Sequence, residues 1–311
     1  MSQAADLGTG MRAAVRETRR QRWTREEVES RILTFLKWLG VVFFVLVTVF
    51  PFIYMILLSV RPIADLARDP GQLFVPFERL TFGTYDEVLR SVEQGGQGFL
   101  SFLRNSAIIA VVAVIASLLL AIPGAYAISR LDFFGRRQVS FMFLAVYLFP
   151  AILLAIPLFV FFTRIGLRGS LIGLIIVYAS QTVPVTIHML RTYFHSIPES
   201  LEESAMLEGC NRFQVMRHIS IPLAMPAIMS TGLFVFMIAW NEFLFALLFL
   251  VDRRDSWTVS LGLSQLANST IEVPTTVVMA GAVILTVPII VVFFLTERLL
   301  VEGLTAGAEK G

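Results

Sequence analysis

The residues with the clearest chemical potential lie in one charged segment between two long apolar runs. This segment extends from His195 to Pro222 and holds Glu199, Glu202 and Glu203. Grouped carboxylates can take part in catalysis, bind a metal, or place negative charge at the positive end of a helix dipole. The rest of the sequence decides among these uses.

Catalysis and metal binding are not expected of this chain. The only two lysines, Lys37 and Lys310, do not follow glycine, so the Gly-Lys pair of a phosphate-binding loop is missing and ATP must be hydrolysed elsewhere. There is no Gly-x-Ser-x-Gly element either. Cysteine or acidic partners at metal-ligand spacing are lacking beside all three histidines, which are His188, His195 and His218. We therefore expect no enzymatic activity and no metal.

The spacing inside the charged segment predicts two short helices joined by a hinge. Ser196 is expected to cap the first helix, with Glu199 three residues on in a capping-box spacing. Gly209 can adopt the left-handed conformation that ends a helix. Asn211 with Gln214 repeats the cap signal for a second helix, which should run to about position 219 before the chain returns to an apolar run.

A helix–glycine–helix hairpin of this kind has a shape that suits mechanical coupling. If the hairpin lies outside a bilayer and is joined to two membrane spans, it would transmit movement of a soluble partner to those spans. An ordinary interfacial loop is the alternative, and the capping signals alone do not separate the two.

Polar residues inside the apolar runs mark a second candidate site. Trp240-Asn241-Glu242 lies well inside such a run, and a carboxylate at membrane depth costs about 2.5–3.5 kcal/mol on insertion scales. Glu242 is therefore expected to face a cavity or a partner rather than lipid. Gln181, shortly before Pro184, allows the same two interpretations. These residues either line a translocation path or stabilise a contact with a partner chain, and we favour the structural role.

The elements that must position these residues are membrane helices. Of the 311 residues, 56% are hydrophobic and 15% charged, whereas soluble domains carry about 25% charged residues. A single cysteine excludes an internal disulfide framework, and the scattered basic residues give no nucleic-acid-binding surface. The hydropathy pattern predicts an all-α membrane protein with six spans, at about 39–60, 103–129, 139–163, 170–191, 223–251 and 277–300.

Basic residues indicate the direction of these spans. Six spans place both termini on one side, and the positive-inside rule makes that side cytoplasmic. The expected organisation is a cytoplasmic N-terminal extension at 1–38, a membrane domain at 39–300 with its charged loop at 192–222, and a cytoplasmic tail at 301–311. An amphipathic helix is expected at 24–37. Seven prolines lie in the spans, where they either bend the helices or reflect the ordinary frequency of proline in membrane helices: Pro51, Pro123, Pro150, Pro157, Pro184, Pro226 and Pro288.

The charged loop resembles a known signature. It resembles the EAA motif of binding-protein-dependent ABC importer permeases. In this sequence Glu203-Ser204-Ala205 is followed by three residues, Gly209, nine further residues and then Ile219-Ser220-Ile221-Pro222. Serine replaces the middle alanine, and Cys210 stands where that family usually has alanine. From about residue 39 onward the chain also resembles the second permease of maltose-type importers, in the segments Asn105-Ser106, Gly124 to Arg130, Gly135-Arg-Arg137, Phe149-Pro150, Ile165-Gly-Leu167, Ala239 to Glu242 and Gly303 to Gly307.

The resemblance implies a type I ABC importer permease fold with a cytoplasmic coupling-helix loop. Glu203 would face the ATPase subunit, Ala205 would allow close approach, and Gly209 would form the turn. The residues implied in ATPase coupling are Glu202, Glu203, Ser204, Ala205, Gly209, Ile219, Ile221 and Pro222. The resemblance also implies that the tail contacts the ATPase dimer through Leu304, Thr305 and Gly307, a frayed terminus being the alternative.

Partners and cargo follow from the same resemblance. It implies a sister permease, two copies of an ATP-binding subunit, an extracytoplasmic solute-binding protein, membrane lipid and a sugar substrate, in a bacterial cytoplasmic membrane. ATP and Mg would bind at the ATPase subunits, with no cofactor on this chain. A di- or oligosaccharide is the favoured cargo; a polyol or glycerophosphate ester is the alternative. A self-sufficient secondary transporter would need more membrane-buried charge than Glu242 offers.

Overall fold

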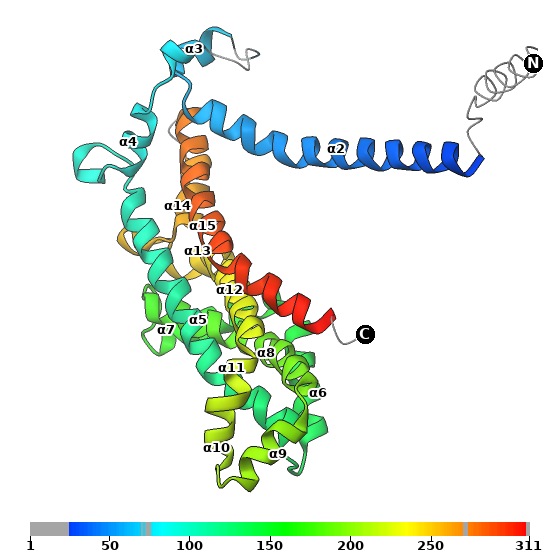
Figure 1. Cartoon of the computed structure of the whole chain (residues 1–311). Helices are drawn as coiled ribbons and strands as arrows, with labels where there is room; N and C mark the ends of the chain where they lie inside the picture. Colours follow the sequence, from blue (N-terminus) through cyan, green and yellow to red (C-terminus); the bar gives the residue numbers. More distant parts are fainter. Residues whose placement is uncertain (1–24, 70, 72–75, 270–272, 309–311) are drawn as a thin grey trace, which may run out of the picture. The chain divides into compact units, whose positions relative to one another are not determined.

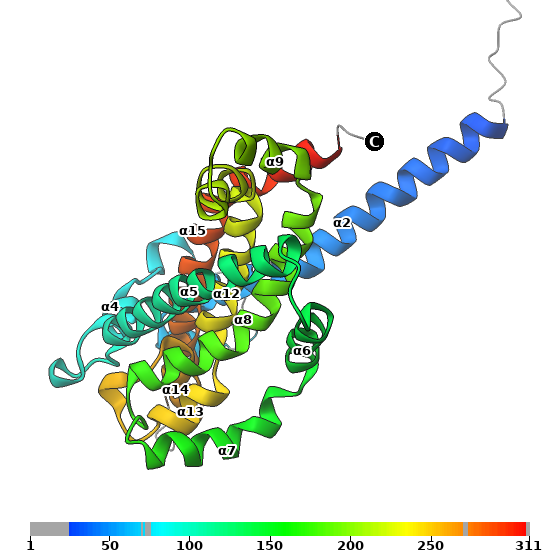
Figure 2. The same ribbon diagram turned by 90° about the horizontal axis from the view of Figure 1, so that it is seen from below.

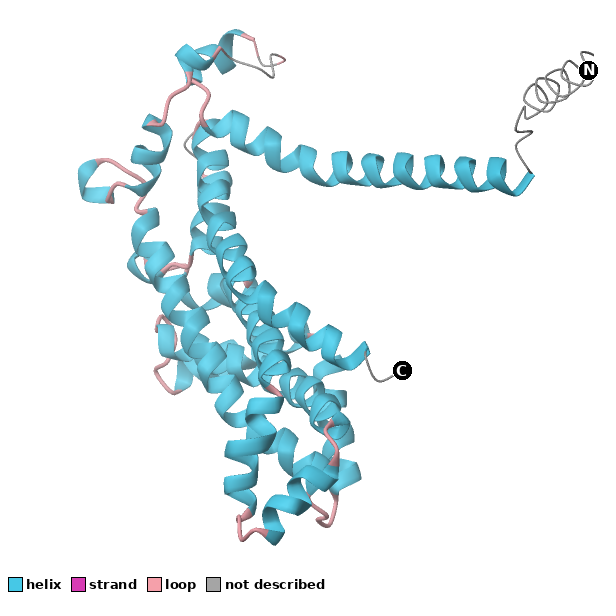
Figure 3. Ribbon diagram, viewed as in Figure 1, coloured by secondary structure: helices cyan, strands magenta, loops and turns pink. Residues whose placement is uncertain are grey.

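The computed structural model describes residues 25–69, 71, 76–269 and 273–308, and within these ranges all regular structure is helical (Figures 1 and 3). The side chains of 27, 28 and 298–308 lie outside the described part. The chain divides into two units, Met1–Tyr54 and Met55–Gly311, which are treated separately. Nearly all of the packed interior belongs to the second unit.

The first unit is described from Arg25, where helix α2 (Arg25–Ser59) begins. The expected amphipathic helix at 24–37 therefore continues without a break into the first apolar span. Its side chains are almost all exposed within this chain, and the stretch Glu29–Ser59 is long and apolar enough to cross a membrane. Such a helix requires lipid or another chain around it.

Four helices are long and apolar enough to span a membrane, and the described residues contain six spans if each of two bent pairs counts as one. Besides α2, the long helices are α5 (Phe99–Arg130), α8 (Leu171–Ser196) and α15 (Thr275–Ala308). The bent pairs are α6 (Arg136–Leu148) with α7 (Ala151–Arg164), at 92°, and the stretch Arg212–Leu223 with α12 (Met225–Asn241), at 76°.

Two of the spans expected from hydropathy are broken. The stretch 139–163 bends between Leu148 and Ala151, because Pro150 lacks an N–H and disfavours helical geometry at Phe149 before it. The stretch 223–251 is interrupted after Asn241, and α13 (Leu244–Leu250) follows. Hydropathy predicted these apolar stretches but does not show where a helix breaks.

Helices α5, α8 and α12 form the centre of the second unit, with α15 packed on α12 (Figures 1 and 2). Four alanines of α5 are fully buried, and their small side chains let α8 and α12 approach closely. They are Ala110, Ala113, Ala121 and Ala125. Midway along the α5–α8 contact the Ser117 hydroxyl bonds to the Thr182 hydroxyl at 2.8 Å.

Short elements join the spans. Between α2 and α5 lie α3 (Ile63–Arg68), η1 (Phe77–Arg79), α4 (Gly83–Leu89) and η2 (Val92–Gln94). Between α8 and α12 lie α9 (Glu199–Leu207), α10 (Arg212–Val215), the π-helical turn η3 (Met216–Ser220) and α11 (Ile221–Leu223). Between α13 and α15 lie η4 (Arg254–Ser256) and α14 (Val259–Ala267). The α9–α10 hairpin and the α4 region lie at opposite ends of α5 (Figure 1).

Candidate functional site: the α9–α10 hairpin

The turn of the hairpin depends on Gly209, as predicted. Its φ is +96°, a left-handed conformation that ends α9. The Gly209 N–H donates to the Met206 carbonyl at 3.1 Å and the Cys210 N–H to the Ala205 carbonyl at 3.0 Å, so two carbonyls at the helix end are satisfied. A Cβ at Gly209 would meet nothing within 4 Å. Backbone conformation, not space, therefore requires glycine here.

The second helix is capped as expected and runs further than expected. Asn211 Oδ1 accepts from the Gln214 N–H at 2.9 Å, and Gln214 Oε1 accepts from the Asn211 N–H at 2.8 Å. The helical path continues through η3 and α11 to Leu223, past the predicted end near Ile219. A π turn absorbs one extra residue without ending the helix.

The predicted cap at Ser196 is wrong. Helix α8 includes Ser196, whose hydroxyl donates to the Tyr193 carbonyl at 2.7 Å. Pro198 occupies the N-cap position of α9, and Ile197 before it is extended. Because a proline disfavours helical geometry in the preceding residue, α8 ends at Ser196, and the N-cap of α9 lies two positions later than the capping-box spacing indicated.

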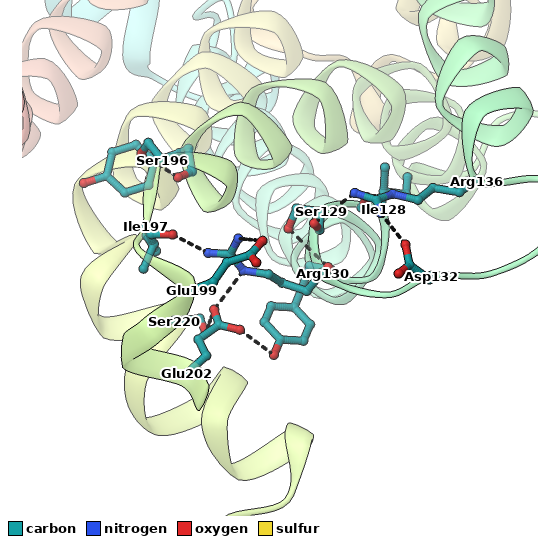
Figure 4. A network of polar contacts seen from close by, with 12 residues as sticks. Ile128, Ser129, Arg130, Asp132, Arg136, Ser196, Ile197, Glu199, Glu202 and Ser220 are labelled. Carbon is teal, nitrogen blue, oxygen red and sulfur yellow. Dashed lines mark hydrogen bonds and ion pairs between the residues drawn. The ribbon is translucent and has the colours of Figure 1, made fainter. Parts of the chain in front are cut away.

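A buried cluster of polar groups fastens the hairpin to the end of α5 (Figure 4). Glu202 is 4% exposed, and its Oε1 accepts from Arg130 Nε at 3.1 Å and from the Ser220 hydroxyl at 2.9 Å. Its Oε2 accepts from the Tyr126 hydroxyl at 3.2 Å. We call Tyr126, Arg130, Glu202 and Ser220 the anchor cluster. It joins three elements, because its members lie on α5, α9 and η3.

Arg130 also ties the start of α9 to α5. Its side chain is 4% exposed, and it donates to the Ile197 carbonyl at 2.6 Å and to Glu199 Oε1 at 3.2 Å. Every strong acceptor around this guanidinium comes from the α8–α9 junction or from α9. A buried ion pair with such hydrogen bonds is costly to break, since removing one partner leaves an uncompensated charge.

Two of the motif residues lie inside the chain. Glu202 was expected to take part in ATPase coupling and Ala205 to allow close approach, and in the structure they are 4% and 8% exposed. Glu203 and Ser204 are exposed as a docking residue must be. Near the return to α12, Ile219 and Ile221 are half-buried and Pro222 is exposed.

The exposed end of the hairpin carries apolar side chains among charges. Leu207 is 89% exposed and Phe213 63% exposed, beside the exposed Glu203 and Glu208. We call these four residues and Gly209 the hairpin tip. Large apolar side chains held in water by a turn are typical of a protein-binding surface.

Sequence reasoning missed Tyr126 and Arg130 as members of the site. Arg130 was used only as a positive charge that indicates membrane orientation, and Tyr126 only as part of a resembling segment. Their separation of four residues places them on one face of α5, which was the available signal. Their acidic partner lies more than seventy residues further along, so no local pattern identifies it.

The second candidate site is a helix break held by a carboxylate. Glu242 Oε1 accepts from the Phe245 N–H at 2.9 Å, and Oε2 accepts from the Ala246 N–H at 3.2 Å and from the Tyr178 hydroxyl at 2.5 Å. The carboxylate thus caps α13 of its own chain, a role that neither sequence interpretation included. Asn241 is exposed and donates to the Met237 carbonyl at 2.9 Å.

For two further sets of predicted site residues, Gln181 and the C-terminal tail, the structure shows little. Among the described residues, the Gln181 Nε2 is buried without a hydrogen-bond partner. The tail residues Leu304, Thr305 and Gly307 lie in the last turns of α15, and their side chains are outside the described part. Within the described ranges no three acidic, histidine or cysteine side chains gather in a way that could hold a metal.

Comparison with protein families decides the identity of the chain. Residues 113–304, more than half of the sequence, match the family of binding-protein-dependent transport system inner membrane components. The chain belongs to this family. An EAA-type hairpin, helical spans and no catalytic motif are what such a transport component requires. The resemblance found in the sequence is thereby confirmed, and the chain is a multi-pass permease rather than an enzyme.

Individual relatives agree with the family. The chain is 36% identical to an inner membrane ABC transporter permease of Escherichia coli, covering 88% of this chain and 95% of the relative. It is 36% identical to a trehalose/maltose transport system permease of Thermococcus litoralis, covering 92% and 99%. It is 32% identical to a diacetylchitobiose uptake system permease of Streptomyces coelicolor, covering 85% and 92%.

A solved structure confirms the fold. The model is similar, with a TM-score of 0.74 and 25% sequence identity, to a chain of a bacterial ABC transporter that imports the acidic polysaccharide alginate. The similarity covers 89% of this chain and 98% of that one. The ABC importer permease architecture expected from the sequence is therefore present.

Proposed function

We propose that this permease carries a di- or oligosaccharide across the membrane and is driven by separate ATPase subunits that bind the hairpin tip. The observation that carries the proposal is the anchor cluster. It makes the hairpin one body with the end of α5, a helix of 32 residues that spans about 48 Å at 1.5 Å per residue. Force applied at the tip therefore acts on a transmembrane helix.

The distribution of charge supports a cytoplasmic position for the hairpin. With both termini on the hairpin side, as six spans require, that side holds 16 of the 25 lysines and arginines, six of them at the hairpin end of the spans: Arg130, Arg136, Arg137, Arg191, Arg212 and Arg217. Loops at the other end mix arginines with aspartates and glutamates. By the positive-inside rule both termini are then cytoplasmic, where ATP and Mg bind to two copies of the ATPase partner.

Cargo is inferred from the relatives. Their names include trehalose, maltose and diacetylchitobiose, and the solved neighbour imports a polysaccharide. All of these are saccharides of two or more units. A soluble binding protein would deliver such a sugar to the face opposite the hairpin, and a sister permease would complete the path.

Reconstitution tests this function directly. The chain is assembled in liposomes with its sister permease, ATPase subunits and binding protein, and uptake of trehalose, maltose and diacetylchitobiose is measured with ATP inside. We expect ATP-dependent uptake of at least one. Uptake of none, in liposomes that hydrolyse ATP, would refute the sugar assignment.

A tip variant tests the docking surface, with a matched control. Leu207→Asp places a charge on the tip, whereas Phe134→Asp makes the same change at a fully exposed side chain in the α5–α6 loop. We expect Leu207→Asp to lose the ATPase subunits on purification and Phe134→Asp to keep them. Equal retention by both variants would exclude the tip as the docking surface.

A further inference from the structure

A hollow at the opposite end of α5 from the hairpin has no role in the function proposed so far. Its volume is about 450 Å³, within the range of small-ligand sites. It lies between the start of α5, the η4 turn and α14. The residues that matter for its chemistry are Gln97, Phe102, Arg254, Trp257, Gln265 and Asn268.

The floor of this hollow is aromatic and held in place. The rings of Phe102 and Trp257 lie 5.6 Å apart between centroids. Trp257 Nε1 donates to the carbonyls of Leu250 and Val251 at 3.0 and 3.2 Å, which fixes the indole. At Gly262 a Cβ would come within 2.4 Å of the Phe102 ring, so α14 lies directly against it. The floor is therefore preorganised.

The rim carries hydrogen-bonding groups that the described part of the chain leaves unused. The side-chain amides of Gln97 and Gln265 have no hydrogen-bond partner among the described residues, and Asn268 uses its Nδ2 on Ser264 at 2.8 Å while its Oδ1 accepts nothing there. Arg254 lies over the Trp257 ring at 5.5 Å and donates one N–H to the Gln97 carbonyl at 3.2 Å. Three amides and a guanidinium thus offer donors and acceptors at one opening.

This combination fits a sugar. Neighbouring hydroxyls of a pyranose each donate and accept; the side-chain amides can do both, and the guanidinium adds donors. The C–H face of the ring is apolar and can contact the half-buried Trp257, the more accessible of the two rings because Phe102 is only 2% exposed. We propose that the hollow is a sugar-binding subsite on the face where the cargo enters. The proposal rests on the sugar-import function above.

Protection from chemical labelling tests the subsite. Val273 lines the hollow and contributes no hydrogen-bonding side chain, so Val273→Cys in a Cys210→Ala chain is a suitable reporter. The assembled complex is treated with a membrane-impermeant maleimide, without binding protein, using the sugar that the same complex takes up. At ten times the dissociation constant, labelling should slow about tenfold, because only the unoccupied fraction reacts.

Two controls separate the possible outcomes. Glu93→Cys, exposed in η2, should label at the same rate with and without sugar, and adding Gln265→Ala to the reporter should abolish protection. Unslowed labelling in a complex that transports the sugar would overturn the subsite and leave the import function standing. Protection by sugar-free binding protein but not by sugar would also overturn the subsite, since the hollow would then be a surface where the binding protein docks. A complex that takes up no sugar would refute the import function itself.

Discussion

Two carboxylates of this permease, the buried Glu202 and the half-buried Glu242, have contrasting surroundings. Glu202 bonds to Arg130 and Tyr126 of α5 and to Ser220 of η3, so it joins elements far apart in sequence. Glu242 bonds mainly to backbone N–H groups three and four residues further on. The carboxylate shared among three elements makes them move together, whereas the one that caps its own segment has a single distant partner, the Tyr178 hydroxyl of α8.

Arg130→Ala should have the largest effect, because it leaves Glu202 buried without its cation. Loss of one partner of a buried pair costs about 3–5 kcal/mol. We expect the free energy of opening of the α9 amides, measured by hydrogen exchange in the assembled complex, to fall by this amount. Sugar-stimulated ATPase activity should also be lost. Amides of α13, next to Glu242, should keep their protection.

The double variant Arg130→Met with Glu202→Leu sharpens this test. Replacing a buried pair by apolar groups of similar size is often neutral. Protection of α9 should therefore return, while sugar stimulation of ATPase stays low because the bonds joining the three elements are absent. Full recovery of stimulation would show that packing alone couples hairpin and span.

Gly209→Val should have the next largest effect, on the tip alone. A β-branched residue at positive φ costs about 1–3 kcal/mol, and Gly209 has φ +96° with open space around it. Gly166, in the α7–α8 loop, has φ +76° and equally open space, so Gly166→Val is a matched control. We expect sugar-stimulated ATPase activity to fall sharply only in Gly209→Val, with both chains inserted in the membrane. Undiminished stimulation in an assembled Gly209→Val complex would refute coupling through the turn.

The sequence predicted the local features of the hairpin better than the contacts of the two carboxylates. Gly209 and the Asn211–Gln214 box were predicted because turn and cap signals are local. Glu202 was expected to take part in ATPase coupling, but its contacts were not predicted, because Tyr126 and Arg130 lie 76 and 72 positions away and only packing brings them near. Glu242 was expected to face a cavity or a partner chain rather than lipid, since an unpaired carboxylate at membrane depth is costly. Its backbone partners could not be predicted, because hydropathy does not show a helix break.

Glu242→Ala tests the local role of the second carboxylate. It removes the cap of α13 and the bond to Tyr178, and a lost cap costs about 0.5–2 kcal/mol. Amide protection in α13 should fall by that amount, while Glu242→Gln, which keeps an acceptor oxygen, should lose less. The ratio of stimulated to basal ATPase activity should stay near that of the unaltered chain. A collapse of that ratio in both variants would mean that this carboxylate also transmits motion.

Ser220→Ala should have the smallest effect and sharpens the comparison most finely. It deletes one of the hydrogen bonds to Glu202 and leaves Arg130 and Tyr126 in place. The net loss should be about 0.5–1.5 kcal/mol. Because this bond alone ties η3 to the carboxylate, amide protection should fall in η3 more than in α9. Thr231→Ser, which retains a hydroxyl able to donate to the Ala227 carbonyl inside α12, is the control. An equal fall of amide protection in η3 and α9 would mean that the anchor cluster opens as one unit. The Ser220 bond would then hold the hairpin as strongly as the Arg130 bonds.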